Sequence, residues 1–294
     1  MINLINRTVL MSGADFFDNA AAINPYMNAA TPIDRALAQH EHQQVKKAFE
    51  TAGITIVQVP PPHGCQDGIY TANWAFCHGD KAVLGCLPQA RRAEEAYAAR
   101  VLRGLGKEVI TLPDGLRFSG QGDALPCGNY LFAGSGYRTD RRVHSFLADY
   151  LGYQVIGLQT APLTNADGTP VINSVSGWPD SYYYDIDLAL AVLRPAGAGR
   201  KSLIAWCPEA FTAESQRVIR SLSDIETVDV SLTETMHAFA CNLVSTGEVV
   251  VMSAHAPQLK IALQSRGLRV ITPEISELTK GGGYIRCISL TIHN

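Results

Sequence analysis

Residues 130–158 read YLFAGSGYRTDRRVHSFLADYLGYQVIGL and contain the structural unit on which the predicted fold depends. A short apolar strand is predicted over 130–134, a helix over 139–151 and an alternating strand over 153–158. Within the helical segment, apolar residues recur at the spacing of one helix face. Gly152 follows at the position where a helix C-cap favours glycine. The stretch therefore reads as a strand, a helix and a second strand.

The same unit occurs five times along the chain. The first strands are predicted at 9–13, 82–86, 130–134, 203–207 and 249–253, the helices at 33–52, 91–105, 139–151, 212–223 and 257–266, and the second strands at 54–59, 108–112, 153–158, 225–230 and 268–272. An open, doubly wound sheet shows the same alternation. Five near-equal units that fill the chain favour closure around a central axis instead, with one cleft shared by all of them. No low-complexity linker interrupts the units, so residues 1–294 are predicted to form a single α/β domain.

The composition excludes several classes of protein. Of the 294 residues, 47% are hydrophobic and 17% are charged, so the chain can bury a large core. A net charge of −3 gives no basic surface for nucleic acid, and no apolar run is long enough to span a bilayer. The start of the chain lacks the pattern of a secretory signal. The seven scattered cysteines favour reduced thiols in a cytoplasm over disulfides or a zinc site.

Residues 281–287 read GGGYIRC and precede an apolar, strand-like stretch at 288–292. Three consecutive glycines cost conformational entropy and offer no side chains for packing. They are explained if the backbone approaches something bound there, with the thiol of Cys287 at the edge of that approach. The alternative is a glycine turn beside a buried structural cysteine.

Charged and amide residues gather in the segments between the units. The clusters centre on Asn24, on Asp67 and Asn73 with Arg91 and Arg92, on Ser119 and Asp123 with Arg138, and on Asp185. Carboxylates and carboxamides on one rim of a cleft suit a planar cation such as a guanidinium, and arginines suit a carboxylate at the other end of the same molecule. A thiolate beside them would attack the amidino carbon. Any one cluster alone could be a capped turn or a solvated loop.

Seven motifs within these clusters carry a resemblance to a known superfamily. They are INPYM at 23–27, DGIYTAN at 67–73, RRAEE at 91–95, FSGQGD at 118–123, RTD at 138–140, FACN at 239–242 and GGGYIRC at 281–287. In this order, and over essentially its whole length, the chain resembles the amidino-modifying (pentein) superfamily, close to the dimethylarginine dimethylaminohydrolase, arginine dihydrolase and glycine amidinotransferase relatives. The resemblance implies a five-bladed α/β propeller. It also implies a hydrolase that cleaves a C–N bond of a guanidino or amidino substrate through a covalent amidino-thioether.

The resemblance further implies roles for individual residues, with Cys287 as the nucleophile. The predicted substrate-binding residues are Asn24, Asp67, Asn73, Arg91, Arg92, Asp123, Arg138 and Gly282. Asp67 and Asn73 are expected on the guanidino group. Either Arg91 or Arg92, together with Arg138, is expected on a substrate carboxylate. No cofactor or metal is expected, because the electrophile is already cationic and a thiolate is intrinsically nucleophilic. The expected partner is the small substrate itself, and the sequence leaves a homo-oligomer open.

Two positions depart from the superfamily pattern, and they define the catalytic candidates beside Cys287. Members carry a histidine where the best alignment places Asp185, and a carboxylate where this chain has Ser119. In the usual mechanism the histidine protonates the leaving amine and then activates water, while the carboxylate orients it. In one interpretation Asp185 takes over this proton transfer, with its pKa raised by burial and with Ser119 or a nearby tyrosine holding it.

Other interpretations remain open at this stage. The fold could have kept a pocket but lost turnover, and would then bind a guanidino compound or act as a scaffold. An amine acceptor in place of water would make the protein an amidinotransferase. His237 is a further candidate for the missing base, although a surface or core histidine is the simpler interpretation. Retention of Cys287 with its glycine segment favours an enzyme.

Overall fold

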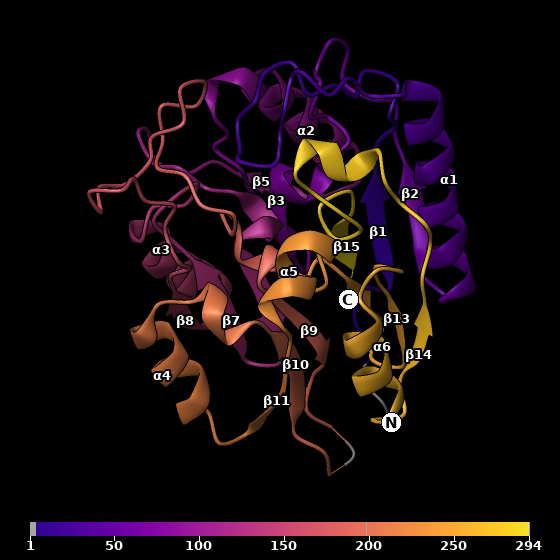
Figure 1. Ribbon diagram of the computed structural model, residues 1–294, viewed down its shortest axis with the longest axis vertical. Coiled ribbons are helices and arrows are strands. Elements are labelled where there is room, and N and C mark those ends of the chain that lie inside the picture. The colour runs from indigo at the N-terminus through magenta and orange to yellow at the C-terminus, as the bar shows by residue number, and fades with distance from the viewer. Residues whose placement is uncertain (1–3, 198, 294) are drawn as a thin grey trace.

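Five three-stranded sheets form the framework of the computed structural model, which describes residues 4–197 and 199–293. Figure 1 shows the sheets arranged around a common centre, with α1 (Arg35–Thr51) at one edge of the molecule. The helices α3 (Arg142–Leu151) and α4 (Ala213–Ser221) lie at the opposite edge (Figure 1). The predicted five-bladed α/β propeller is confirmed.

Each sheet has the same internal order. The central strands are β1 (Thr8–Met11), β4 (Lys81–Leu84), β7 (Tyr130–Gly134), β10 (Ser202–Trp206) and β13 (Val249–Val251). Each pairs in parallel with the strand that follows its helix: β2 (Thr55–Gln58), β5 (Glu108–Ile110), β8 (Gln154–Leu158), β11 (Ile225–Asp229) and β14 (Arg269–Ile271). Each also pairs antiparallel with a third strand: β15 (Leu290–His293), β3 (Ala75–His78), β6 (Ala124–Cys127), β9 (Leu190–Arg194) and β12 (Val244–Ser245). The connecting helices on the outside include α2 (Ala93–Gly104) and α6 (Pro257–Gln264).

The third strands line the centre of the propeller. β15 contacts β3, β6 contacts β9, and β9 contacts β12, so neighbouring sheets meet along these strands. Because β15 pairs with β1, with Leu10 opposite Leu290, the end of the chain completes the sheet that its start begins. The segment that leads into β15 is therefore fixed at the centre of the molecule.

The five predicted helices and ten predicted strands of the repeat are confirmed to within a few residues. Of the third strands, only β15 is anticipated by the sequence pattern. The others are two to five residues long and almost completely buried, so they lack the alternation of apolar and polar residues that marks a half-exposed strand. The short helix α5 (Leu232–Ala238) is likewise absent from the prediction.

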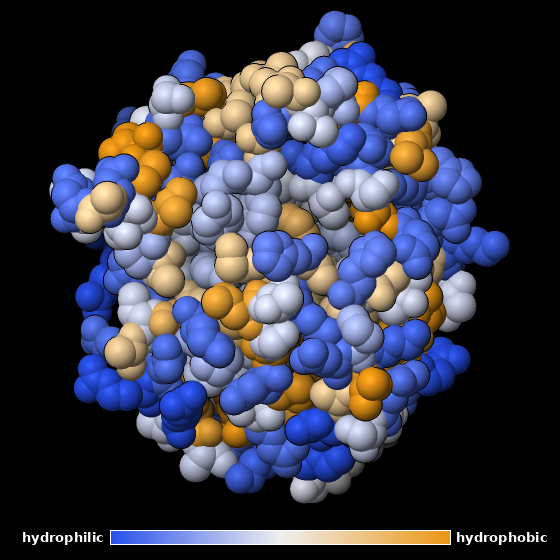
Figure 2. Space-filling view, viewed as in Figure 1, coloured by the Kyte–Doolittle hydropathy of each residue, from blue (hydrophilic) through white to orange (hydrophobic). Residues whose placement is uncertain are grey.

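On the face shown in Figure 2, apolar residues are scattered among hydrophilic ones. Among the described residues, the helices are all too short or too polar to cross a membrane. The seven cysteines are free thiols.

Candidate active site

The segments that lead into the third strands meet at the centre of the propeller. They are η1 (Thr71–Trp74) before β3, η3 (Gly120–Gly122) before β6, η4 (Ile186–Leu188) before β9, the turn 239–242 before β12, and the segment 281–289 before β15. In this order they carry or adjoin the polar side chains of Asn73, Asp123, Asp187, Asn242 and Cys287. Hydrogen bonds join the segments, as where the backbone N–H of Ala72 donates to the Cys287 carbonyl at 3.1 Å. The five-fold repeat therefore explains why residues far apart in sequence share one site.

Cys287 lies in this centre with 3% of its surface exposed. Its Sγ accepts a hydrogen bond from the Asn242 amide at 3.2 Å, and its S–H donates to the Asp187 carboxylate at 3.6 Å. Burial raises the pKa of the Cys287 thiol well above its usual range, and the charges of Asp187 and Asp185 raise it further. The sulfur thus makes two polar side-chain contacts, while Cys287 itself packs within the main buried hydrophobic cluster. Positive charge brought close to the sulfur would favour the thiolate here.

Side chains of the protein itself fill the space beside the three glycines. A Cβ at Gly281 would lie 2.0 Å from the Tyr70 hydroxyl, and a Cβ at Gly282 would lie 2.4 Å from Asn24 Oδ1. Gly282 also has a φ of +88°, which residues with a side chain rarely adopt. The Asn24 amide donates to the Gly281 carbonyl at 3.0 Å. The glycines therefore permit a close approach of the backbone to Asn24 and Tyr70, and this packing holds the segment that ends in Cys287.

Asp185 lies against Asn73 and Ser119. The Asn73 amide donates to Asp185 Oδ2 at 2.8 Å and to Ser119 Oγ at 3.0 Å. The other carboxyl oxygen, Oδ1, is buried and has no hydrogen-bond partner within the described part of the chain. Burial raises the pKa of Asp185, while the charge of Arg138 and the hydrogen bonds of Ser119 and Asn73 oppose that rise. The site thus brings together the three residues and leaves one acidic oxygen available to a ligand.

Two further carboxyl groups share the site with Asp185. Asp123 accepts hydrogen bonds from the backbone N–H of Ile186 at 2.9 Å and from the Thr139 hydroxyl at 2.6 Å. Burial, reinforced by the charge of Asp185, raises the pKa of Asp123 to about 8. The same two causes raise the pKa of Asp187 well above its usual range. Three buried carboxyl groups in one site, two of which act on the thiol, favour a cation as the occupant.

We expect the free energy of unfolding to fall as the pH rises from about 6.5 to about 8. The pKa of Asp123 is 3.8 in ordinary surroundings and about 8 here, so the folded protein holds this proton more tightly than the unfolded chain. The resulting stabilisation is complete below about pH 4 and is lost as the pH rises through the folded pKa, at up to about 1.4 kcal/mol per pH unit. Buried His42, with its pKa lowered from 6.5 to about 4, acts in the opposite sense below pH 6.5 and so sets the lower end of the window. Urea unfolding at several pH values measures the slope.

The control for this slope is Asp123→Asn. The amide oxygen can still accept from Ile186, but the side chain no longer titrates, so the slope between about pH 6.5 and 8 should flatten. A free energy of unfolding that stays constant or rises across the window in the unaltered protein contradicts the raised pKa.

Arg91 belongs to a buried network. Its guanidinium donates to Glu94 at 2.8 and 3.0 Å and to Asn73 Oδ1 at 2.7 Å. It also donates to the backbone carbonyls of Asp67 and Tyr70. Because Oδ1 of Asn73 is held in this way, its NH₂ group is directed at Asp185. Arg91 therefore fixes the orientation of Asn73, and the predicted contact of Arg91 with a substrate carboxylate has no support in this geometry.

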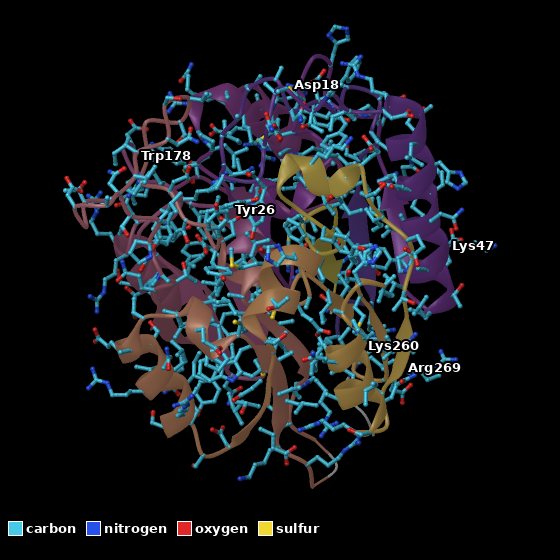
Figure 3. The ribbon with its side chains drawn as sticks, in the orientation of Figure 1. Asp18, Tyr26, Lys47, Trp178, Lys260 and Arg269 are labelled. Carbon is cyan, nitrogen blue, oxygen red and sulfur yellow. The ribbon has the colours of Figure 1, made fainter. Side chains whose placement is uncertain are left out.

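The other two predicted arginines lie in different places. Arg92 is exposed and lines a surface hollow together with Trp178, which Figure 3 shows toward the edge of the molecule, so the prediction of Arg92 as a substrate contact is not supported. Arg138 is only 7% exposed, and its guanidinium lies 3.8 Å from the ring centre of Tyr184. It donates to the Ile23 carbonyl at 3.0 Å. Of the two, Arg138 alone is in the site.

Asn24 and Asp67 are both buried beside this centre. The loop that carries Asn24 reaches inward, since Figure 3 shows Tyr26 near the middle of the face and its ring lies 4.7 Å from that of Phe239. Asn24 Oδ1 accepts from the backbone N–H of Tyr26 at 3.0 Å. The Asp67 carboxylate accepts from Gln66 at 3.1 Å, and burial raises the pKa of Asp67 to about 6.

The structure adds Asp187 and Asn242 to the set predicted from the sequence, because both contact the sulfur of Cys287. The signals were present in the sequence. Asp187 is the second acid of the run at 185–187, and Asn242 ends the FACN motif. His237, by contrast, is exposed on α5, which agrees with its interpretation as a surface histidine.

The amino-acid sequence of the chain is similar to those of known enzymes. The chain is 31% identical over 288 residues to N(G),N(G)-dimethylarginine dimethylaminohydrolase of Mycobacterium tuberculosis, covering 98% of this chain and 86% of that protein. It is 28% identical to the bifunctional arginine dihydrolase/ornithine cyclodeaminase AgrE of Nostoc, covering 96% of this chain but only 37% of that enzyme. No protein-family model matches the chain.

Solved structures give the same result for the fold. The N-terminal domain of ArgZ, a cyanobacterial arginine dihydrolase, superimposes with a TM-score of 0.82 at 26% identity and 97% coverage of both chains, in a complex with its substrate. A second structure of that domain is covalently bonded to a reaction intermediate. A structure of dimethylarginine dimethylaminohydrolase has a TM-score of 0.70 at 17% identity, a likeness in fold.

Proposed function

Because the chain belongs to the dimethylarginine dimethylaminohydrolase family, we propose that it hydrolyses a C–N bond of a small guanidino substrate through a covalent amidino-thioether on Cys287. The predicted resemblance to guanidino-modifying hydrolases is confirmed by these relatives. One observation carries the proposal: the sulfur lies 3.2 Å from an amide donor and 3.6 Å from a carboxylate, inside a buried acidic site.

A bound guanidinium would supply the positive charge that a thiolate needs here. Its N–H groups suit the carboxylate of Asp187, and its charge would lower the pKa of that acid and of the thiol together. The proton of Cys287 would pass to Asp187, to which the S–H already donates. The nucleophile would therefore form when the substrate is bound.

Asp185 then performs the proton transfers that histidine performs in other members. As the C–S bond forms and the C–N bond breaks, Oδ1 of protonated Asp185 gives its proton to the leaving amine. The resulting carboxylate takes a proton from water, whose oxygen attacks the amidino carbon. The C–S bond breaks, the hydroxyl proton passes to the released amine, which leaves as an ammonium ion beside the neutral ureido product, and the thiolate regains its proton from Asp187. Asn73 and Ser119 hold Asp185 for both steps.

The remaining site residues bind the rest of the substrate. Arg138 makes one hydrogen bond to the described part of the protein, so its other N–H groups can bind a substrate carboxylate. Asp67 and Asn24 are further substrate contacts at the rim of the acidic cluster. Asp123 supports the site by holding Ile186 and Thr139, since these donors occupy both of its oxygens. Gly282 acts through its backbone, because a side chain there would displace Asn24.

The proposal is tested by incubating the protein with arginine, its N-methylated forms and decarboxylated guanidino amines. We expect a ureido product and a released amine from at least one compound, detected by mass spectrometry. Acid quenching during turnover should also trap an amidino adduct on the Cys287 peptide. Inclusion of an amine acceptor tests the alternative of amidino transfer, which would yield a new guanidino compound. Binding without product or adduct across the whole panel contradicts the proposal and supports a binding protein.

Three further expectations from the sequence accompany this proposal. We propose a cytoplasmic location, supported by the seven free cysteines. The single domain over residues 1–294 and a homo-oligomer both stay predictions.

A further inference from the structure

We propose that Asn242 is a further catalytic residue, whose side-chain amide holds the nucleophile segment in place and donates the hydrogen bond that stabilises negative charge on Cys287. This inference rests on the proposed role of Cys287 as the nucleophile.

The oxygen of the Asn242 side chain organises the backbone around the sulfur. Oδ1 accepts hydrogen bonds from the backbone N–H groups of Tyr284 at 3.0 Å, Arg286 at 3.1 Å and Cys287 at 3.1 Å. Three N–H donors require an oxygen at this position, so the orientation of the amide is determined by the network. The NH₂ group must therefore point the other way.

That NH₂ group points at the reacting atom. Nδ2 donates to Cys287 Sγ at 3.2 Å and to the backbone carbonyl of Asp187 at 3.3 Å. Asn242 is completely buried, so no water competes for these hydrogen bonds. One side chain thus joins the segment of Asp187 to the segment of Cys287 and uses both N–H groups in doing so.

The surroundings of the sulfur make this donor important. The titratable groups that face Cys287 are Asp187, Asp185, Tyr70, Tyr184 and, on its own segment, Arg286. The two acids oppose a thiolate. Arg286 directs its side chain at Asn6 and Thr291 instead of at the sulfur. Among the described residues, Asn242 is thus the side chain that donates a hydrogen bond to Sγ, and such a bond favours the charged form of the thiol.

The test is Asn242→Asp, which keeps the shape and the accepting oxygen but replaces the donating NH₂ with a second oxygen. We expect the pKa of the Cys287 thiol to rise by about one unit or more. Turnover near neutral pH should fall at least about tenfold, with the alkaline rise of the rate displaced upward. The thiol pKa is measured from the pH dependence of iodoacetamide alkylation of the Cys287 peptide, which requires no turnover.

The matched control is Asn19→Asp. Asn19 is also buried, and its NH₂ donates to the carbonyls of Asn28 at 2.9 Å and Thr31 at 2.8 Å rather than to the sulfur. The same chemical change there should leave the thiol pKa unaltered. An unchanged thiol pKa in Asn242→Asp, or an equal change in the control, overturns the inference.

A second measurement covers the case in which Asn242→Asp does not fold. In the unaltered protein, the side-chain amide protons of Asn242 should shift in NMR spectra as the Cys287 thiol titrates, and this shift should vanish in Cys287→Ser. Chemical shifts of the Asn242 amide protons that do not change as the Cys287 thiol titrates overturn the inference. The NMR experiment tests the hydrogen bond between Asn242 and Cys287, whereas turnover by Cys287→Ala tests the proposed function. If the hydrogen bond is detected but Cys287→Ala still turns over substrate, the contact is correct and the proposed function is wrong.

Discussion

Replacement of Cys287 with alanine is expected to reduce turnover of a guanidino substrate by at least about 10⁴-fold, because it removes the thiol that is proposed to form the covalent bond to the amidino carbon. The Cys287 sulfur is held by hydrogen bonds to Asn242 and Asp187 at 3.2 and 3.6 Å. The next nucleophilic candidate is the Ser119 hydroxyl, which accepts a hydrogen bond from the Asn73 amide. Alanine removes the sulfur but leaves the three carboxyl groups. Substrate binding, measured by isothermal titration calorimetry, should therefore persist while the ureido product disappears.

Cys77→Ala is the matched control for this experiment. Cys77 is buried to a similar extent, at 5% exposure against 3% for Cys287, and burial raises its pKa to about 12. It lies on β3 in a different buried apolar cluster from Cys287, among residues such as Ala82 and Leu102. The control should retain turnover within about twofold. Comparable loss in both variants would mean that packing, and not the nucleophile, had been removed, and full turnover in Cys287→Ala would exclude the covalent mechanism.

The repeating part of the fold is predictable because its signals are local. Helical periodicity, as in residues 139–151, and a glycine C-cap such as Gly152 with its φ of +77° depend only on the chain near them. The third strands of the sheets are different. β12 has two residues and β6 contains Pro126, so nothing local distinguishes them from loops. They form because the closed ring buries them, and that information is not local.

The residues of the site also differ in how far local sequence predicts them. Cys287, Asp185 and Ser119 are predicted by comparing motifs, and the structure brings Asp185 and Ser119 together through Asn73. The partners of Arg91 are not given by a motif, although Glu94 at i+3 signals an ion pair within one helical turn. Asn242 is missed because its role depends on three backbone N–H groups contributed by a segment more than forty residues away.

Asp185→Asn is expected to lower turnover by at least about 100-fold, which is the usual contribution of a general acid and base. The amide keeps the hydrogen bond from Asn73, since its oxygen can still accept at the position of Oδ2. It cannot give a proton to the leaving amine from the position of Oδ1. Because burial raises the pKa of Asp185, the acid form is present at higher pH than for an ordinary aspartate, and the rate should fall as the pH rises past that raised pKa. In Asp185→Asn this fall should be absent, so the shape of the pH–rate profile changes as well as its height.

One control variant and one restoring variant accompany Asp185→Asn. Asp180→Asn alters another buried aspartate whose pKa is raised by burial. Asp180 accepts a hydrogen bond from Asn173 rather than from Asn73, so this variant should keep the pH–rate profile of the unaltered protein. Asp185→His combined with Ser119→Glu rebuilds the histidine and carboxylate of other members, at two positions that Asn73 already links at 2.8 and 3.0 Å. This double variant should gain turnover toward plain arginine derivatives relative to Asp185→Asn. A pH–rate profile that is identical in the unaltered protein and in Asp185→Asn would show that the proton moves through another group. Asp187 would then be the acid to test, since its carboxylate already accepts the S–H of Cys287.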